Sequence, residues 1–502
     1  MPARAVQSRL RLSLVGLAAV LLVLAFPPFD LGCLALVALV PWLNGLEECS
    51  ARTAWWRGYA IGLLFFAGTM WWLVHVTLVG LVILVAALAL YFAAFSLFAT
   101  WQLRQPLSCR SLLLAATLAS TWTFLEWLRG TLLSGLGWNL LAHTQWHSPL
   151  VQIADLIGAY GVSWLVVFVN VAVWQAWRRR CWRPAAAVGL VLALVVGYGV
   201  VRRAAVERAL ARSPVVRVAL LQGNIPQSQK WDVGFLESIM QRYDALTRQA
   251  AQAGAQLIIW PETAVPALAN TPEFQAWLGH LSREVKIPLL VGAPWGAGES
   301  ATRLMNSALL VTPDGRVADR YDKMHLVPFG EFIPGEAWWP GLGRVRDWLP
   351  IGEFTPGTRA TVFDVPTAPP LSLSTLICFE DLFPAISRMM VRHGARLLVT
   401  ITNDAWFGQT AAPIQHAQAS TLRAIESRVW MLRAANTGWT GAIDPAGRIV
   451  AREQVWVPGV VVAPVALAPL GPTLYTRLGD WWLLLCAACL LLPYLILIKY
   501  KS

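Results

Sequence analysis

The stretch LSLSTLICFEDLFP, Leu371 to Pro384, places one cysteine between an apolar run and two acidic residues. The run LSLSTLIC has the composition of a buried strand, and Pro384 to His393 is predicted to form a helix. Cys378 therefore lies where a strand ends. Two interpretations are open. Cys378 is either a small core residue, as most buried cysteines are, or a nucleophile at the carboxyl end of a strand, where the sites of α/β sheets assemble.

The alternation of strand and helix continues on both sides of this stretch. Further strands are predicted at VVRVALLQGN, QLIIW, IPLLVGAP and RLLVTITN, and helices at Phe235 to Gly254, Glu273 to Val285 and Pro413 to about Leu432. The segments SALLVTPDGRVADRY, with an Asp314-Gly315 turn, and GAIDPAGRIVARE read as hairpins. Buried strands interleaved with helices predict a layered α/β domain over residues 213–468.

The chain as a whole is too apolar for an ordinary soluble protein, and its long apolar runs lie outside the predicted α/β domain. Of its 502 residues, 57% are hydrophobic and only 14% are charged. A membrane-spanning helix needs about 20 mostly apolar residues. Eight such spans are predicted, near residues 10–27, 31–47, 57–77, 79–101, 111–128, 159–177, 184–201 and 480–498. The first is read as an uncleaved span, because FPPFD follows it in place of a small-residue cleavage site.

Basic residues fall in alternate loops between these spans. They are Arg4, Arg9, Arg11, Arg52, Arg57, Arg104, Arg110, Arg178, Arg179, Arg180, Arg183, Lys499 and Lys501. By the positive-inside rule both termini are cytoplasmic and the domain at 213–468 lies outside the cytoplasm. The net charge of +12 is thus attributed to membrane topology, not to nucleic-acid binding. The outer segment 130–158 is either an interfacial or re-entrant segment or a plain connecting loop.

Polar residues follow two strands and a hairpin of the predicted α/β domain. Glu262 follows the strand in LIIWPET, Lys323 follows the hairpin in YDKMHLVPFGE, and Cys378 ends a third element. Gathered at one sheet edge they would form a base, a charge stabiliser and a nucleophile. Glu262 could instead be a first-turn helix carboxylate and Lys323 a solvated lysine. His325 or His416 could also supply a Cys–His pair.

Cysteine usage bears on the same site. The seven cysteines are Cys33, Cys49, Cys109, Cys181, Cys378, Cys486 and Cys489. Cys378 alone falls within 213–468, so this domain has neither a disulfide framework nor a cysteine zinc cluster. No metal or other cofactor is predicted.

Three motifs in order carry a resemblance. WPET, YDKMHLVPFGEFIP and LICFEDLFP resemble the Glu–Lys–Cys signatures of the nitrilase (carbon–nitrogen hydrolase) superfamily. With seven spans before the domain and one after it, the chain resembles the apolipoprotein N-acyltransferase family of the bacterial inner (cytoplasmic) membrane. LQGNIPQSQKWD, NDAWFG and GWNLLAHTQ add to the match. The resemblance implies a seven-helix membrane domain at 1–203, an α-β-β-α sandwich at 213–468 facing the periplasm, and a last span at 480–498.

The resemblance also implies an activity. An acyl chain would pass from a phospholipid, expected to be phosphatidylethanolamine, to the α-amino group of an N-terminal diacylglyceryl-cysteine, as the last step of lipoprotein maturation. Cys378 would be the nucleophile that carries a thioester, Glu262 the general base and Lys323 the stabiliser of the oxyanion. The kinetics would be ping-pong, with no cofactor, and the protein is expected to be a monomer.

Supporting roles follow from the same motifs. Glu331 in VPFGE would orient the lysine, and Glu380 and Trp231 match positions implicated in activity. Phe379 stands where relatives often carry tyrosine, so only its backbone N–H is expected to serve an oxyanion hole.

Aromatic residues near the motifs suggest how lipid reaches the site. The segment 332–354 carries Trp338, Trp339 and Trp348, and NDAWFG adds Trp406. The segment 332–354 is interpreted as a mobile loop that touches the bilayer and binds substrate, or else as a packed surface loop. Two functions are alternatives to acyl transfer. A membrane-anchored amidase would use water as acceptor, and a transporter or sensor would need ionisable residues in its spans or a degenerate site.

Overall fold

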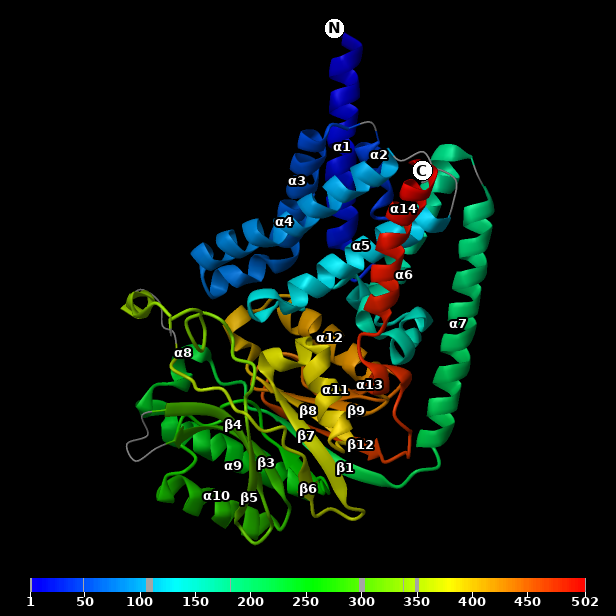
Figure 1. Cartoon of the computed structure of the whole chain (residues 1–502). Helices are drawn as coiled ribbons and strands as arrows, with labels where there is room; N and C mark the ends of the chain where they lie inside the picture. Colours follow the sequence, from blue (N-terminus) through cyan, green and yellow to red (C-terminus); the bar gives the residue numbers. More distant parts are fainter. Residues whose placement is uncertain are drawn as a thin grey trace. The chain divides into compact units, whose positions relative to one another are not determined.

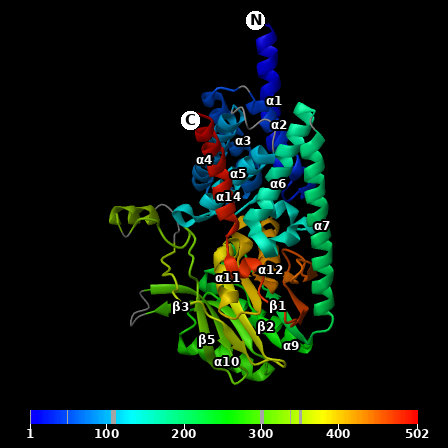
Figure 2. The same cartoon turned by 45° about the vertical axis from the view of Figure 1, so that its right-hand side comes forward.

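The computed structural model describes every residue except 1, 48, 105–111, 181, 298–302, 337, 348–351 and 502. The chain divides into two compact units. The helical unit comprises Met1–Ala205, Thr410–Glu426 and Thr473–Ser502, and the α/β unit comprises Val206–Gln409 and Ser427–Pro472. Figures 1 and 2 label many of the helices and strands of both units.

The helical unit consists of long helices joined by short turns and 3-10 helices. Its elements are α1 (Pro2–Leu24), η1 (Gly32–Leu36), α2 (Val40–Leu46), α3 (Ala51–Met70), η2 (Trp71–His75), α4 (Leu78–Leu103), α5 (Leu112–Thr131), η4 (Leu132–Ser134), η5 (Leu141–Gln145), η6 (Pro149–Ile153), α6 (Ala154–Arg179), α7 (Trp182–Leu210), α12 (Ala412–Ser427), α13 (Leu474–Leu478) and α14 (Trp482–Lys501). The last residues of α7 and α12 pass into the α/β unit.

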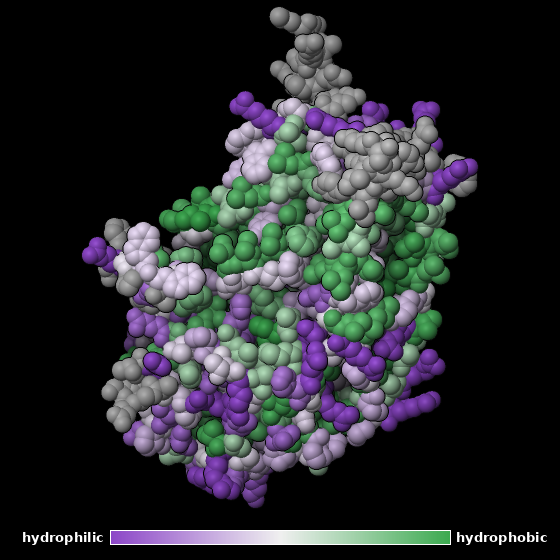
Figure 3. Space-filling view, in the orientation of Figure 1, coloured by the Kyte–Doolittle hydropathy of each residue, from purple (hydrophilic) through white to green (hydrophobic). Residues whose placement is uncertain are grey.

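Four helical segments among the described residues are long and apolar enough to cross a membrane. They are Ala51–His75, Leu78–Leu103, Pro149–Arg178 and Arg183–Leu210. Shorter apolar helices lie at Ser13–Leu24, Gly32–Leu46 and Trp482–Leu492. Hydrophobic side chains are exposed on α4, and Figure 3 shows a hydrophobic surface over this part of the helical unit. The protein is therefore a membrane protein with several apolar helices.

The segment predicted as the second span, 31–47, differs from one continuous helix. It consists of the 3-10 helix η1 and the seven-residue helix α2. A polar side chain on α6 accounts for the break. The amide of Asn170 donates to the Ala35 carbonyl at 2.7 Å and accepts from the Leu39 N–H at 2.8 Å. These bonds satisfy backbone groups that a regular helix would pair internally.

The segment 130–158 is an irregular chain whose backbone groups are hydrogen-bonded by side chains of the helical unit. Arg129 donates to the Trp138 carbonyl at 2.6 Å, and Glu126 accepts from the Leu141 N–H at 3.0 Å. Trp138 is buried. Non-helical backbone in a membrane protein is tolerated where it is buried in protein, so these two charged residues of α5 have a structural task.

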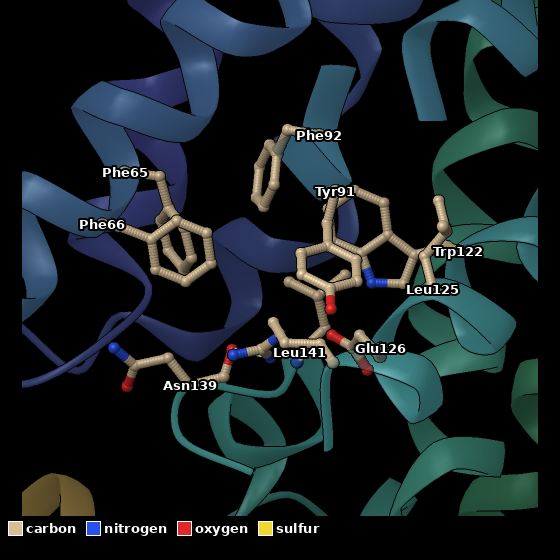
Figure 4. A pocket seen from close by; sticks show the side chains of 10 residues that line it. Phe65, Phe66, Tyr91, Phe92, Trp122, Leu125, Glu126, Asn139 and Leu141 are labelled. Carbon is tan, nitrogen blue, oxygen red and sulfur yellow. Dashed lines mark hydrogen bonds between the residues drawn. The ribbon is translucent and has the colours of Figure 1, made fainter. Parts of the chain in front are cut away.

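The same side chains border a pocket in the helical unit. It is lined by Phe65, Phe66, Tyr91, Phe92, Trp122, Leu125, Glu126, Arg129, Asn139 and Leu141. Figure 4 shows aromatic rings around most of the pocket, with Glu126 and Asn139 on one side of it. The pocket is thus mainly aromatic, and its polar side belongs to the residues that hold the irregular segment.

Helix α12 groups with the helical unit, although the predicted domain at 213–468 includes it. Gln415 explains this grouping. Its side-chain oxygen accepts from the indole N–H of Trp72 at 3.1 Å and of Trp138 at 2.9 Å. Its nitrogen donates to the carbonyls of Pro27 at 3.1 Å and Thr69 at 3.0 Å. One amide thus fills its hydrogen-bonding capacity with partners in this unit.

The α/β unit contains two six-stranded sheets. The first has the order β12-β1-β2-β3-β4-β5, with β1 parallel to β2 and β2 parallel to β3. The second has the order β11-β10-β9-β8-β7-β6, with β7, β8 and β9 parallel. The strands are β1 (Val215–Gln222), β2 (Leu257–Ile259), β3 (Leu289–Ala297), β4 (Arg303–Val311), β5 (Val317–Asp322), β6 (Phe363–Val365), β7 (Leu371–Ile377), β8 (Leu397–Thr402), β9 (Trp430–Ala435), β10 (Gly441–Ile443), β11 (Ile449–Arg452) and β12 (Gly459–Ala466).

Helices cover both sheets. The helices of this unit are α8 (Gln227–Lys230), η7 (Val233–Phe235), α9 (Leu236–Gln252), α10 (Pro272–Val285), η8 (Pro340–Asp347), η9 (Cys378–Leu382), α11 (Pro384–Arg392) and η10 (Asp404–Phe407). Helix α9 packs on β12, β1 and β2, and α11 packs on β7 and β8, while the sheets meet through β1 against β9 and β4 against β7. The predicted layered α/β sandwich is confirmed.

One predicted boundary is wrong. The helix expected from Pro413 to about Leu432 ends at Ser427, and strand β9 begins at Trp430. Arg428 adopts a left-handed backbone conformation with φ of 53°, which ends the helix. Pairing of β9 along its whole length with β8 then outweighs the helical periodicity of the sequence.

Candidate active site

The three polar residues predicted from the sequence follow the ends of three strands. Glu262 follows β2, Lys323 follows β5 directly, and Cys378 follows β7 directly. The structure brings them together. The Lys323 ammonium lies 3.9 Å from the Glu262 carboxylate, and the charges of both side chains act on the Cys378 thiol. The carboxyl ends of strands in an α/β sheet are where such residues converge.

Glu262 is placed by a close approach of backbone to strand β3. The N–H of Ala264 donates to the carbonyl of Gly292 at 2.8 Å. A Cβ atom at Gly292 would lie 2.2 Å from the Pro261 carbonyl oxygen and 2.8 Å from the Glu262 Cα. Only glycine leaves room for the segment that carries the glutamate. Nothing in the local sequence around Gly292 indicates this requirement.

An amide and a second carboxylate complete the surroundings of Lys323. Asn306 on β4 donates to Glu262 Oε1 at 2.7 Å and to Glu331 Oε1 at 3.0 Å. Glu331 Oε2 pairs with the Lys323 ammonium at 2.8 Å and accepts from the Val327 N–H at 2.8 Å. All the side chains of this network are buried apart from Val327, which contributes only its N–H. Asn306 was not predicted, because nothing in its local sequence distinguishes it from other strand residues.

Burial and neighbouring charge perturb all three central groups. Burial raises the pKa of Glu262, and Lys323 partly offsets the effect. Burial would lower the pKa of Lys323, but Glu331 and Glu262 hold that pKa well above its ordinary value. Burial and the Glu262 carboxylate raise the pKa of the Cys378 thiol well above its usual range. At rest the lysine is charged and the cysteine is a thiol.

Cys378 has a strained backbone. Its φ is 53°, in the left-handed region that disfavours residues with a Cβ. The residue is also partly exposed. Strain of this kind persists where the surrounding structure fixes it, and it clusters at active sites. The strain and the exposure favour the nucleophile over the small core residue.

Glu380 lies two residues after Cys378 in the chain, and its carboxylate accepts four hydrogen bonds. Its Oε1 atom accepts from the Tyr321 hydroxyl at 2.7 Å, the Met324 N–H at 2.8 Å and the His325 N–H at 3.1 Å. Its Oε2 atom accepts from the Ile377 N–H at 2.7 Å. The side chain therefore ties the segment that carries Lys323 to the end of β7.

A buried lysine that was not predicted as a site residue lies beside this network. Lys230, the last residue of α8, donates from Nζ to the backbone carbonyl of Glu262 at 3.1 Å. Its neighbour Trp231, predicted as a substrate-binding residue, is 52% exposed. The motif QKWD drew attention to the tryptophan, whereas the structure buries the lysine.

The remaining aromatic residues lie at the surface or pack together. Trp338 is 93% exposed, Trp339 71% and Trp406 43%, and Trp348 lies outside the described residues. Phe379 packs against Phe383 with ring centroids 5.0 Å apart. The exposed pair belongs to the segment 332–354, which is therefore not packed at these two positions.

The two histidines considered as partners of the cysteine have other surroundings. The ring of His325 packs on Phe383 at 4.0 Å and on Phe379 at 5.8 Å. His416 is buried in the helical unit, where its ring lies 5.2 Å from that of Trp138. Searched over the described residues, the structure holds no group of three or more His, Cys, Asp or Glu side chains able to bind a metal ion.

Comparison with known proteins agrees with both parts of this architecture. Residues 217–475 match the carbon-nitrogen hydrolase family, a class of enzymes in the nitrilase superfamily, and residues 18–172 match the apolipoprotein N-acyltransferase N-terminal domain. The apolipoprotein N-acyltransferase of Geobacter metallireducens is 36% identical over 94% of this chain and 92% of that protein. That of Methylococcus capsulatus is 36% identical over 92% of this chain and 91% of that protein. The chain belongs to the apolipoprotein N-acyltransferase family, which confirms the resemblance seen in its motifs.

Solved structures match this chain more distantly. An amidase from Nesterenkonia sp. AN1, with an acetamide moiety added at its active-site cysteine, is 21% identical with a TM-score of 0.40. The match covers 53% of this chain and 95% of the amidase chain.

Proposed function

We propose that this protein transfers an acyl chain from a phospholipid to the α-amino group of an N-terminal diacylglyceryl-cysteine of lipoproteins, through a thioester on Cys378. The observation that carries the proposal is the buried network of Glu262, Asn306, Glu331 and Lys323 beside a strained, partly exposed cysteine. Family membership supplies the substrate classes, and phosphatidylethanolamine is the donor expected.

In the first half-reaction, Glu262 accepts the thiol proton as the Cys378 sulfur attacks the donor ester carbonyl. The charged Lys323 and the N–H of Phe379 stabilise the oxyanion of the tetrahedral intermediate. The carbon–oxygen bond then breaks, and Glu262 returns the proton to the leaving lysophospholipid. A thioester remains on the sulfur.

In the second half-reaction, the lipoprotein amine attacks the thioester carbonyl and gives its proton to Glu262. The carbon–sulfur bond breaks, the amide product leaves, and Cys378 recovers the proton as a thiol. A raised pKa suits Glu262 for both steps, because a base with a pKa closer to neutrality also serves as an acid.

We further propose an arrangement of eight spans with both termini in the cytoplasm and the α/β unit in the periplasm. Arginine and lysine in alternate loops support it. Trp338 and Trp339 are then placed to meet the bilayer and admit lipid. To test the sidedness, a Trp338→Cys change in a Cys378→Ser background is labelled in spheroplasts with a membrane-impermeant maleimide. Labelling only after lysis would contradict the orientation.

The chemistry is tested with purified protein and phosphatidylethanolamine labelled in its acyl chains. The expected result is a hydroxylamine-sensitive adduct on Cys378 that passes to a diacylated lipopeptide. Cys378→Ser should form no thioester, and Cys489→Ser is the matched control. Release of free fatty acid without transfer would favour a hydrolase, and absence of any adduct would refute the nucleophile.

A further inference from the structure

Lys230 is a fully buried lysine, which is unusual for a charged residue. Its side chain has no exposure to solvent, and α8 delivers it directly beside Glu262. As far as the described residues go, its ammonium makes one hydrogen bond, to the Glu262 carbonyl, and no ion pair. An ammonium has three N–H groups, so two of them have no hydrogen-bond partner among the described residues. Burying such a charge without a paired carboxylate is costly.

Lys230 offsets an excess negative charge in the network around it. Lys323 is balanced by Glu331 at 2.8 Å, with Glu262 at 3.9 Å. Counting Glu262 and Glu331 as negative and Lys323 as positive, the network carries one excess negative charge before the cysteine reacts. Transfer of the thiol proton to Glu262 leaves this total unchanged and moves the negative charge onto the sulfur. With Lys230 the four groups are neutral at rest.

Two further carboxylates near the cysteine have their own partners. Glu380 accepts four hydrogen bonds. Asp404, whose charge also acts on the Cys378 thiol, lies 3.8 Å from the Arg433 guanidinium. Neither group therefore serves as the counter-charge of Lys230. The ammonium interacts electrostatically with Glu262 and Cys378 instead.

We propose that Lys230 is a second active-site cation, which supplies the counter-charge for the Cys378 sulfur when the thiol loses its proton. It acts on the sulfur through space and holds the backbone of Glu262 through its hydrogen bond. This inference rests on the proposed function, because it assigns Cys378 the role of nucleophile. Burial lowers the pKa of Lys230 to about 8, against the pull of Glu262 and Cys378, so the group is still charged at neutral pH.

The reaction of Cys378 with iodoacetamide tests the inference without any lipid substrate. Full-length protein in detergent is alkylated over a pH series, and the modified Cys378 peptide is quantified by mass spectrometry. Lys230→Met removes the charge and keeps an unbranched side chain, and Lys230→Arg keeps the charge. Each unit by which the thiol pKa rises reduces the thiolate fraction about tenfold. Lys230→Met is therefore expected to alkylate at least about tenfold more slowly at neutral pH.

The shape of the pH profile separates this role from a merely structural one. In the wild type, losing one proton above pH about 8 leaves either neutral lysine with thiol or charged lysine with thiolate. The reactive second form then stays at a constant fraction, so the rate should level off there. In Lys230→Met the rate should keep rising about tenfold per pH unit, and Lys230→Arg should keep the fast neutral-pH reaction.

Parallel profiles for wild type and Lys230→Met would overturn the inference. If Lys230→Met fails to fold, the comparison of Lys230→Arg with Lys230→Gln replaces it, and equal neutral-pH rates for these two would overturn it as well. The proposed function is judged separately. A wild-type protein that takes up no acyl chain on Cys378 refutes the transferase, whereas alkylation still reports on Lys230.

Discussion

Replacement of Glu380 by glutamine probes the link between the lysine and the cysteine of the site. In the wild type one carboxylate oxygen accepts from Tyr321, Met324 and His325, and the other accepts from Ile377. Glutamine keeps the shape but replaces one oxygen with a donor. In its less damaging orientation the amide nitrogen faces the Ile377 N–H, so two donors meet and that backbone group loses its acceptor.

The cost can be worked from these four bonds. One buried N–H left without an acceptor costs about 1–3 kcal/mol. The other three bonds lose a charged acceptor, which weakens each by about 1 kcal/mol. Burial already raises the pKa of Glu380, so removing its charge recovers part of this loss. A net destabilisation of roughly 2–4 kcal/mol is expected for Glu380→Gln.

Activity should fall more steeply than stability. Met324 and His325 follow Lys323 directly, so loosening them moves the lysine to which we assign stabilisation of the oxyanion. A misplacement of about 1 Å can cost about a hundredfold in rate. The measurements are thermal unfolding of the full-length protein in detergent and the rate of acyl-adduct formation on Cys378. Tyr321→Phe is the matched control, because it removes one donor and leaves no backbone group unpaired. If Glu380→Gln forms the adduct as fast as Tyr321→Phe, the reasoning is refuted.

Three other changes test neighbouring parts of the site. Gly292→Ala should cost about 1–3 kcal/mol and slow adduct formation, because its Cβ overlaps the Pro261 carbonyl; an unchanged rate and melting temperature would show that the segment can move freely. Arg433→Met removes an ion-pair partner of the buried Asp381 and should cost about 3–5 kcal/mol in thermal unfolding, whereas a variant of wild-type stability would argue that this pair is dispensable. The raised pKa of Glu262 means that its base form is lost on acidification at a pH above 4.5. The acidic limb of the pH profile of kcat/KM should therefore have its midpoint above pH 4.5. A midpoint at or below pH 4.5 would exclude Glu262 as the base.

The three residues that we propose to react could be predicted as one cluster from the sequence because they stand where strands end. Glu262, Lys323 and Cys378 each follow an apolar or hairpin segment that periodicity identifies. Asn306 and Lys230 could not be found in this way. One is a strand residue and the other closes a four-residue helix, and only the tertiary fold turns them toward Glu262.

The misplaced helix end near Leu432 has a related cause. The sequence from Pro413 onward is compatible with helix, but β9 has a place in the middle of a sheet between β8 and β10. Backbone pairing with two neighbours decides its conformation, and a single sequence window does not contain those neighbours. The grouping of α12 with the helical unit depends in the same way on remote partners, because Gln415 bonds to residues more than 270 positions away.

The resting state of the site follows from its balance of charges. Burial and Glu262 keep Cys378 as a thiol, which is less easily oxidised than a thiolate. This suits a thiol on the periplasmic side, where we propose that the α/β unit lies. The same balance of charges makes the reactivity of the Cys378 thiol depend on bound substrate. In the proposed mechanism, deprotonation of Cys378 becomes favourable only as its negative charge passes to an ester oxygen held by Lys323 and the Phe379 N–H. Such a site would keep Cys378 as a thiol until a lipid ester occupies it. Lys230 would then lower the free energy required to transfer the thiol proton to Glu262.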